Sequence, residues 1–146
     1  MAYSGRYRPV NPKKYKGNFK NIIYRSLWEL KFMRWCDGNN NVIEWGSEEI
    51  IIPYISPIDN KVHRYFPDFY VKAYTKEGTS KKYIIEVKPF KQTKPPKKPK
   101  RSRSSEKYLT ETITYEVNSA KWKAAIEFCK DHRCEFRILT EKELKV

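Results

Sequence analysis

Residues 89–107 constrain the fold of this chain more than any other segment, because they hold four of its nine prolines and eight lysines or arginines. Proline lacks the backbone donor that helices and sheets need, and so charged a segment cannot bury apolar surface. Apolar patterning resumes after the segment. We therefore expect one domain, residues 1–146, from which residues 89–107 emerge as a mobile, basic, proline-rich loop.

The net charge points to a polyanionic partner. The chain carries 31 lysines and arginines against 17 aspartates and glutamates, a formal net charge of +14. Neutralising phosphates releases condensed counterions, so nucleic acid is the expected partner, ahead of an acidic protein or an anionic membrane. No apolar run approaches the length of a membrane span, and residues 1–17 lack the apolar core of a signal peptide. We expect a soluble protein made in the cytoplasm, with no membrane partner.

Apolar periodicity predicts one helix early in the chain and one late in it. Residues 26–36 begin with Ser26 and Glu29 at the spacing of a capping box, and this helix is apolar over much of its circumference, so we expect it to be buried. Ser119 is expected to cap the second helix, whose apolar face holds Trp122, Ala125, Ile126 and Cys129. A strand over 135–139 and a last helical turn over 141–144, capped by Thr140, complete the chain.

Strand-like runs lie between the first helix and the basic loop. Residues 42–45 lead into 49–55, and residues 63–74 and 82–88 follow after segments rich in turn-forming residues. Strands joined by short turns predict an antiparallel meander.

The strongest chemical pattern is Pro67-Asp68 on one expected strand and Glu86-Val87-Lys88 on the next. Two carboxylates on neighbouring strands supply the oxygen ligands that Mg²⁺ prefers, and a bound metal can activate water against a phosphodiester. Side chains two apart share a strand face, so the Lys88 ammonium should lie beside the Glu86 carboxylate and stabilise developing charge. The same residues also fit surface charges on a half-exposed sheet.

Other titratable residues leave alternatives open. Glu29 is either a third ligand of the metal or only the second half of the capping box. Glu48 could reach the site, although a solvated or paired role is expected, and His63 is expected at the surface. The group Cys129, His132 and Cys134 lacks a CxxC pair and a nearby fourth ligand, so ordinary thiols are favoured over a zinc site.

Two basic segments are expected to grip the DNA backbone with little sequence readout. Residues 1–20 contain no acidic residue and read as an irregular basic arm with interleaved tyrosines. The loop at 89–107 is the second segment. The expected phosphate contacts are Arg6, Arg8, Lys13 and Lys14 in the arm, and Lys91, Lys94, Lys97, Lys98, Lys100, Arg101 and Arg103 in the loop.

Four motifs together resemble a known nuclease family. Residues 24–29 read YRSLWE, 45–48 WGSE, 65–69 YFPDF and 84–89 IIEVKP. This combination is similar to the PD-(D/E)xK nucleases of TnsA type and, over nearly the whole chain, to the head-completion nucleases of T4-like phages. The resemblance implies an α+β (α/β) fold of the restriction-endonuclease type, a mixed sheet flanked by helices.

The resemblance also implies a set of roles. Glu29, Asp68 and Glu86 would be catalytic acids that bind Mg²⁺, with Mn²⁺ as a substitute, and Lys88 would be the catalytic lysine. TnsA-type enzymes often carry Gln where this chain has Glu86, and the basic loop departs most from a compact nuclease core. The implied partners are DNA and phage head or portal proteins, met in the host cytoplasm during assembly or in the virion. A structural head-completion protein and a plain nucleic-acid-binding module remain alternatives.

Overall fold

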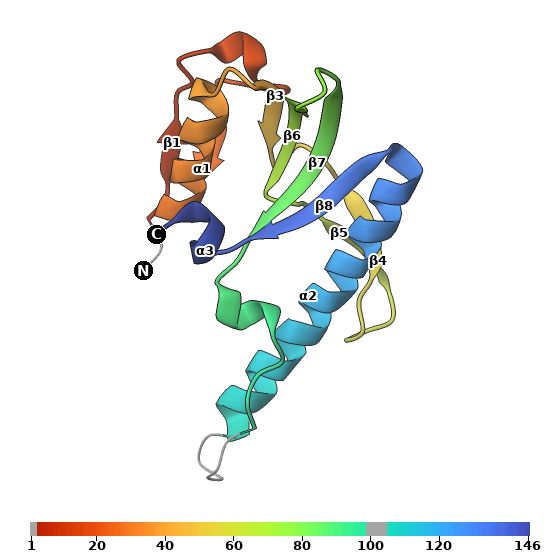
Figure 1. The fold of residues 1–146 in the computed structure, drawn as a ribbon. Coiled ribbons are helices and arrows are strands. Elements are labelled where there is room, and N and C mark those ends of the chain that lie inside the picture. Colours follow the sequence, from red (N-terminus) through yellow and green to blue (C-terminus); the bar gives the residue numbers. More distant parts are fainter. Residues whose placement is uncertain (1–2, 99–104) are drawn as a thin grey trace.

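The structure is a computed structural model, and it describes residues 3–98 and 105–146. A mixed four-stranded sheet in the order β3-β6-β7-β8 lies at its centre (Figure 1). β3, β6 and β7 are antiparallel, whereas β8 pairs with β7 in parallel. The strands are β3 Val42–Ser47, β6 Phe69–Tyr74, β7 Ser80–Val87 and β8 Cys134–Leu139. The expected α+β fold with a mixed sheet and flanking helices is confirmed.

Helix α1, Leu27–Gly38, covers one face of the sheet. Its buried face holds Phe32, Met33 and Cys36, which pack against side chains of β3, β6 and β7. The Ser26 side chain accepts from the Glu29 amide at 3.2 Å, so the predicted start of the helix is confirmed. The expectation that the whole helix is buried is wrong, because Leu27 and Trp35 lie on its outer side, 52% and 51% exposed.

Helix α2, Ser105–His132, covers the opposite face. Trp122, Ala125 and Cys129 pack on this face as predicted, whereas Ile126 is 48% exposed. The prediction that the helix begins at Ser119 is wrong: Ser119 lies inside α2, and its hydroxyl donates to the Tyr115 carbonyl at 2.8 Å. The N-terminal half of α2 extends beyond the sheet, alongside the segment that follows β7 (Figure 1).

The predicted strand over 63–74 is two strands in two different sheets. β5, Val62–Tyr65, pairs with β4, Ile52–Ile55, as a separate hairpin, and β6 enters the central sheet only at Phe69. The break falls at Phe66-Pro67-Asp68, where proline has no amide to donate to a ladder. The predicted meander is therefore wrong for β4 and β5. Glu48, with φ of 54°, marks the other break, between β3 and β4.

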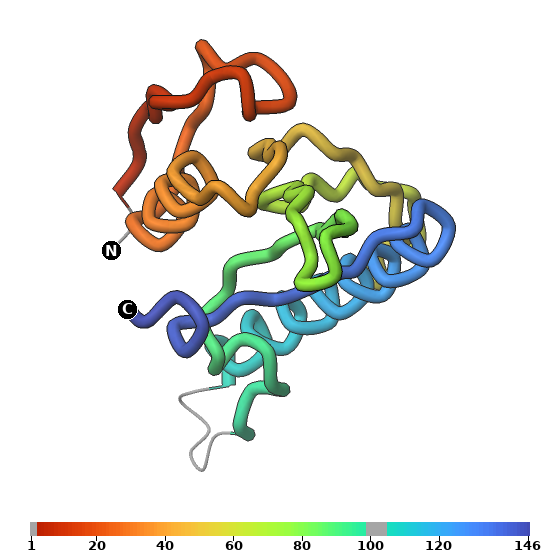
Figure 2. The backbone as a smooth tube through the Cα atoms, turned by 45° about the horizontal axis from the view of Figure 1, so that its top comes forward, coloured from red at the N-terminus to blue at the C-terminus, as the bar shows by residue number. Residues whose placement is uncertain are grey.

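The N-terminal segment is not irregular as expected. β1, Gly5–Tyr7, pairs with β2, Ile22–Tyr24, and a short 3-10 helix, η1 Pro12–Lys14, lies between them. Figure 2 shows the segment running alongside α1, on the side of the sheet away from α2. It is attached there by Asp37 of α1, which is 2% exposed.

The segment after β7 is also partly regular. A 3-10 helix, η2 Phe90–Thr93, follows the strand, and residues 105–107 already belong to α2. Residues 94–98 have no regular secondary structure, and residues 99–104, with Lys100, Arg101 and Arg103, lie outside the described residues. The predicted last turn is α3, Glu141–Leu144, and Thr140 and Glu143 form its capping box. In the two described stretches, no helix has the length and apolarity that crossing a membrane requires.

Candidate active site

Asp68 and Glu86 lie side by side at one end of the central sheet. β6 and β7 pair Phe69 with Ile85, and this register continues to Asp68 and Glu86. The Asp68 Oδ2 atom accepts from the Val87 amide at 2.8 Å, so the two acidic residues are held on adjacent strands as predicted. Asp68 is half-buried and Glu86 is only 6% exposed.

The Glu86 carboxylate has one close donor and one more distant cation. The Tyr65 hydroxyl donates to Oε1 at 2.6 Å, and the Lys88 Nζ lies 3.7 Å from Oε2. Glu86 and Lys88 therefore share a face of β7, as their spacing predicts. A third group approaches from α2, where the Lys121 ammonium lies 5.7 Å from the centre of the Tyr65 ring.

Burial makes the negative charge of this pair costly. Burial, together with the neighbouring Glu86 charge, raises the pKa of Asp68 to about 8, although the Val87 amide acts in the opposite direction. Burial also raises the pKa of Glu86, although Tyr65 and Lys88 act in the opposite direction. Two neighbouring carboxylates with too few cations fit a divalent metal ion, because Mg²⁺ takes one or two carboxylates and keeps several waters.

Glu29 lies near the pair but is not brought into contact with it. Its Oε1 accepts from the Arg25 amide at 3.3 Å, and it does not return a bond to Ser26 as a full capping box would. Burial raises the pKa of Glu29, and the charges of Glu48 and Glu86 raise it further. Within residues 3–98 and 105–146, no three His, Cys, Asp or Glu side chains are grouped closely enough to hold a metal, so the expected convergence of three carboxylates is not observed.

This arrangement can be compared with known proteins. The sequence profile of the family described as "TnsA-like endonuclease N terminal" matches residues 39–141. The chain belongs to the TnsA-like endonuclease family. A relative, the "Head completion nuclease" of Enterobacteria phage T4, is 42% identical over 147 residues, which cover 99% of this chain and 95% of the relative. The resemblance drawn from the motifs and the prediction of an endonuclease are confirmed.

The other candidate ligands of this TnsA-like endonuclease have local partners. Glu48 pairs with Arg25 at 3.1 Å, and the His63 Nε2 lies 2.8 Å from Asp59 at the surface, as expected. The Cys129 and Cys134 sulfurs lie 2.8 Å apart, and the His132 Nδ1 lies 2.9 Å from the Phe128 carbonyl. The interpretation of Cys129 and Cys134 as ordinary thiols stays a prediction.

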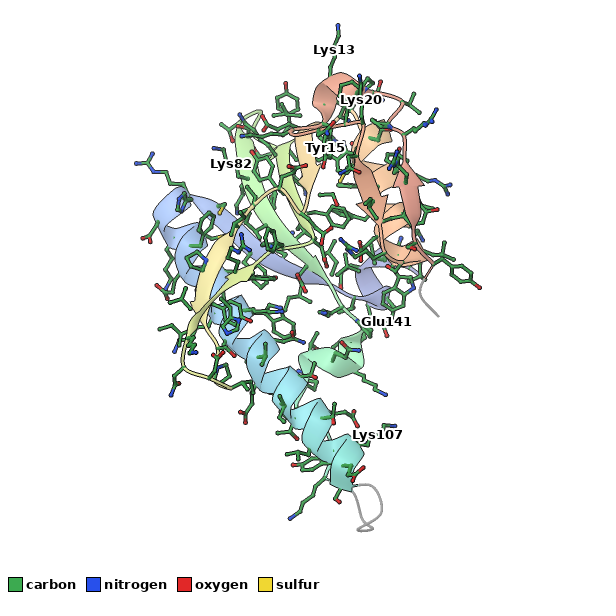
Figure 3. All side chains as sticks on the ribbon, turned by 180° about the vertical axis from the view of Figure 1, so that it is seen from behind. Lys13, Tyr15, Lys20, Lys82, Lys107 and Glu141 are labelled. Atoms are coloured by element: carbon green, nitrogen blue, oxygen red, sulfur yellow. The ribbon has the colours of Figure 1, made fainter. Side chains whose placement is uncertain are left out.

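Some of the basic residues expected to contact DNA form hydrogen bonds within the protein, whereas others are free to bind phosphate. Lys14 donates to the carbonyls of Cys36, Asp37 and Asn39 at 2.7–3.1 Å, which removes it from the surface available to DNA and corrects the expected phosphate contact. Lys13 points away from the molecule (Figure 3). Arg6 and Arg8 line a groove of about 470 Å³. Lys91, Lys94 and Lys97 line a cleft beside α2, and Lys98 is exposed.

Sequence reasoning missed Tyr65 and Lys121. Tyr65 reaches Glu86 because the β4–β5 hairpin folds back over the face that α2 covers, and no local pattern indicates that packing. The available signal was the place of Tyr65, three residues before Asp68. Lys121 was not predicted as a site residue, because its distance from the site depends on how α2 crosses the sheet.

Proposed function

We propose that this chain is a Mg²⁺-dependent DNA endonuclease that acts in phage head completion and hydrolyses phosphodiester bonds with an activated water. The observation that carries the proposal is the buried Asp68–Glu86 pair with Lys88 beside it. A buried pair of carboxylates destabilises the fold unless a cation or a proton accompanies it. Family membership supports the choice of a metal cation over a structural proton.

Asp68 and Glu86 would hold the metal, which would be Mg²⁺ or, in its place, Mn²⁺. Glu29 lies near the pair without contacting it and would have to move toward the metal to act as a third ligand. When bound, the metal polarises the phosphate and lowers the pKa of a water. Tyr65 holds Oε1 of Glu86 and leaves Oε2 directed toward Lys88. The Lys88 ammonium orients the attacking water and stabilises charge on the phosphate in the transition state. The products would be a 5′-phosphate and a 3′-hydroxyl.

The basic surfaces would bind the DNA backbone on both sides of the site. Lys13 of the N-terminal segment and Lys107 of α2 lie at opposite ends of the molecule (Figure 3), so backbone contacts at both ends require a DNA segment that spans it. The proposed contacts are Arg6, Arg8 and Lys13 at one end, and Lys91, Lys94, Lys97 and Lys98 at the other. Lys100, Arg101 and Arg103, outside the described residues, stay predictions.

The biological setting is carried over from the relative. The phage T4 protein is named a head completion nuclease, and the match covers 99% of this chain. We accordingly propose phage head or portal proteins as partners, met in the host cytoplasm during assembly, with retention in the virion as a further expectation. Complementation of a phage that lacks the gene tests this: Asp68→Asn should fail to restore infectious particles if cleavage is the essential role.

A plasmid-cleavage assay tests the enzymatic proposal. Wild-type protein with Mg²⁺ should cut supercoiled plasmid, and EDTA should stop it. Asp68→Asn should lower the rate by on the order of 10³-fold, because several kcal/mol of metal-derived stabilisation are lost. Asp131→Asn is the matched control, since Asp131 is exposed near the end of α2. If Asp68→Asn cuts as fast as Asp131→Asn, the proposed site is wrong.

A further inference from the structure

A large cleft lies outside the carboxylate pair, between residues 90–97 and the N-terminal half of α2. We call it the strap–helix cleft; its volume is about 870 Å³. The strap, residues 90–97, is attached at its start, where the Phe90 amide donates to the Glu141 carboxylate at 2.7 Å. Cavities of 300–1,000 Å³ are typical of small-ligand sites, and this one is therefore large enough for a nucleotide.

The walls of the cleft combine positive charge with flat apolar surfaces. Four lysines line it (Lys91, Lys94, Lys97 and Lys107), against the single carboxylate of Glu111. The rings of Phe90 and Tyr115 and the prolines at 95 and 96 line it as well. Ammonium groups bind phosphate as point charges, and aromatic rings stack on nucleobases. The two kinds of wall together fit a ligand that has both a phosphate and a flat ring.

Asn118 provides an independent sign of a ligand. It lines the cleft, the residue as a whole is only 6% exposed, and its side-chain amide is not among the buried atoms that lack a partner, so the amide faces the open cleft. Because the amide is open to water in the cleft, a ligand can take over its hydrogen bonds in place of that water. An amide offers one acceptor and two donors side by side, the arrangement that matches the edge of a nucleobase.

Both walls of the cleft continue in sequence toward residues of the proposed active site. Asn118 lies about one helical turn before Lys121, whose ammonium lies over the ring of Tyr65, the partner of Glu86. On the opposite wall, the strap begins two residues after Lys88. Residues on both walls of the cleft are thus close in sequence to residues of the proposed active site, although the cleft lining itself does not include the carboxylate pair.

We propose that the strap–helix cleft binds a nucleoside phosphate. The base lies against Tyr115 with its edge hydrogen-bonded to Asn118, and the lysines of the strap and of α2 bind the phosphate. The nucleoside phosphate has two possible sources, a nucleotide of the DNA strand next to the cut bond or a free nucleotide. The strand source rests on the proposed function, whereas the chemistry of the cleft does not.

Ligand binding to the full chain, measured in EDTA so that no metal-dependent cleavage occurs, tests the proposed cleft. The probes are dAMP, deoxyadenosine and inorganic phosphate, titrated by calorimetry. We expect dAMP to bind at least ten-fold more tightly than either of the other two, because only dAMP engages both kinds of wall. Asp68→Asn should bind dAMP like wild type, so failure of the catalytic proposal and failure of the cleft are distinguishable.

Two variants locate the binding, and a third controls for the substitution. Asn118→Leu removes the amide. Thr114→Trp places a large ring in the cleft, and because Thr114 is exposed this substitution does not disturb the packing of the core. Each should weaken dAMP at least ten-fold. Thr79→Trp, in the exposed turn before β7, should not change it. If Thr114→Trp binds dAMP like wild type, or if phosphate alone binds as tightly as dAMP, the proposal is wrong.

Cleavage assays then identify the source. If dAMP raises the KM for DNA and leaves kcat unchanged, the cleft belongs to the DNA strand. If saturating dAMP does not compete with DNA, the cleft belongs to a free nucleotide.

Discussion

Two buried acidic centres lie on the two faces of the sheet, and they differ in how well their charge is satisfied. Asp37 accepts from the Tyr7 hydroxyl at 2.6 Å, the Val10 amide at 2.7 Å and the Asn11 amide at 2.9 Å. On the other side, Asp68 has the Val87 amide and Glu86 has the Tyr65 hydroxyl, while the two carboxylates repel each other. Burial alone therefore does not identify a functional carboxylate.

What separates the two centres is the number of donors per charge. Asp37 has three donors for one carboxylate and attaches the N-terminal segment to α1. The Asp68–Glu86 pair has two short hydrogen bonds for two carboxylates, with the Lys88 ammonium at 3.7 Å. The first arrangement stabilises the fold, whereas the second destabilises it until a cation or proton is present. Each prediction below tests this difference, from the largest expected effect to the smallest.

Asp37→Asn should lower the free energy of unfolding by about 3 kcal/mol, because an amide cannot accept from all the donors that a carboxylate accepts from. Asp68→Asn should keep or raise the stability, since it removes a repulsive charge. Urea denaturation in EDTA measures both, and plasmid cleavage at low temperature should show that folded Asp37→Asn remains active. Equal losses of stability in the two variants would contradict the comparison.

The stability of the metal-free protein should fall as pH rises. The raised pKa values of Asp68, about 8, and of Glu86 mean that the folded state keeps protons that the unfolded state releases. This stabilisation is complete below the unfolded pKa, about 4, and is lost as pH rises through the folded pKa. We expect a loss on the order of 2 kcal/mol between pH 4 and pH 8 by urea denaturation. The slope should be smaller in Asp68→Asn.

Tyr65→Phe should weaken the active site without removing it. The Tyr65 hydroxyl bond lowers the pKa of Glu86, so its loss raises that pKa and moves the acidic limb of the cleavage–pH profile to higher pH by about one unit. At pH 7, the Mg²⁺ concentration that gives the half-maximal rate should rise, because more of Glu86 is protonated. At higher pH Glu86 ionises again, and the cleavage rate should return toward that of the wild type. Tyr108→Phe, on the projecting half of α2, is the control. An unshifted profile would show that Tyr65 only packs.

The smallest expected effects come from replacing two adjacent lysines, Lys13 and Lys14, which differ in whether they are free to contact DNA. Lys14→Met should cost about 1 kcal/mol of stability, because three carbonyls at the end of α1 lose their donor. It should leave the salt dependence of DNA binding unchanged. Lys13→Met should do the reverse, and reduce the slope of log affinity against log salt by about 0.9 if Lys13 contacts one phosphate. If the two variants have identical slopes, Lys13 does not contact a phosphate of the DNA.

The features predicted correctly are those that depend on neighbours in sequence. The cap of α1 at Ser26, the cap of α3 at Thr140, and the shared face of Glu86 and Lys88 follow from spacings of two to four residues. The adjacency of Asp68 and Glu86 required one further step, a short turn between consecutive strands. These local rules were sufficient to find the carboxylate pair.

The features missed depend on packing or on weak propensity. Residues 105–118 hold three threonines with Ile113 and Val117, and β-branched side chains favour strands, so the early start of α2 was not indicated. The hydroxyls of Thr110 and Thr112 instead donate to carbonyls one turn earlier. Tertiary contacts that composition does not encode also separate β5 from β6 and bring Lys14 to the three carbonyls at the end of α1.

The parallel pairing of β7 with β8 has a consequence for when the chain becomes competent. The end of β7 that carries Glu86 pairs with Ile138, and the Lys88 amide donates to the Leu139 carbonyl at 3.0 Å. Closing so long a loop is entropically costly, so contacts of this kind form late in folding. The end of β7 that carries Glu86 is therefore expected to be completed only after β8 has docked, later than the antiparallel pairs of the sheet. Nuclease activity should then appear only after β8 has docked on β7, and not with the antiparallel strands alone.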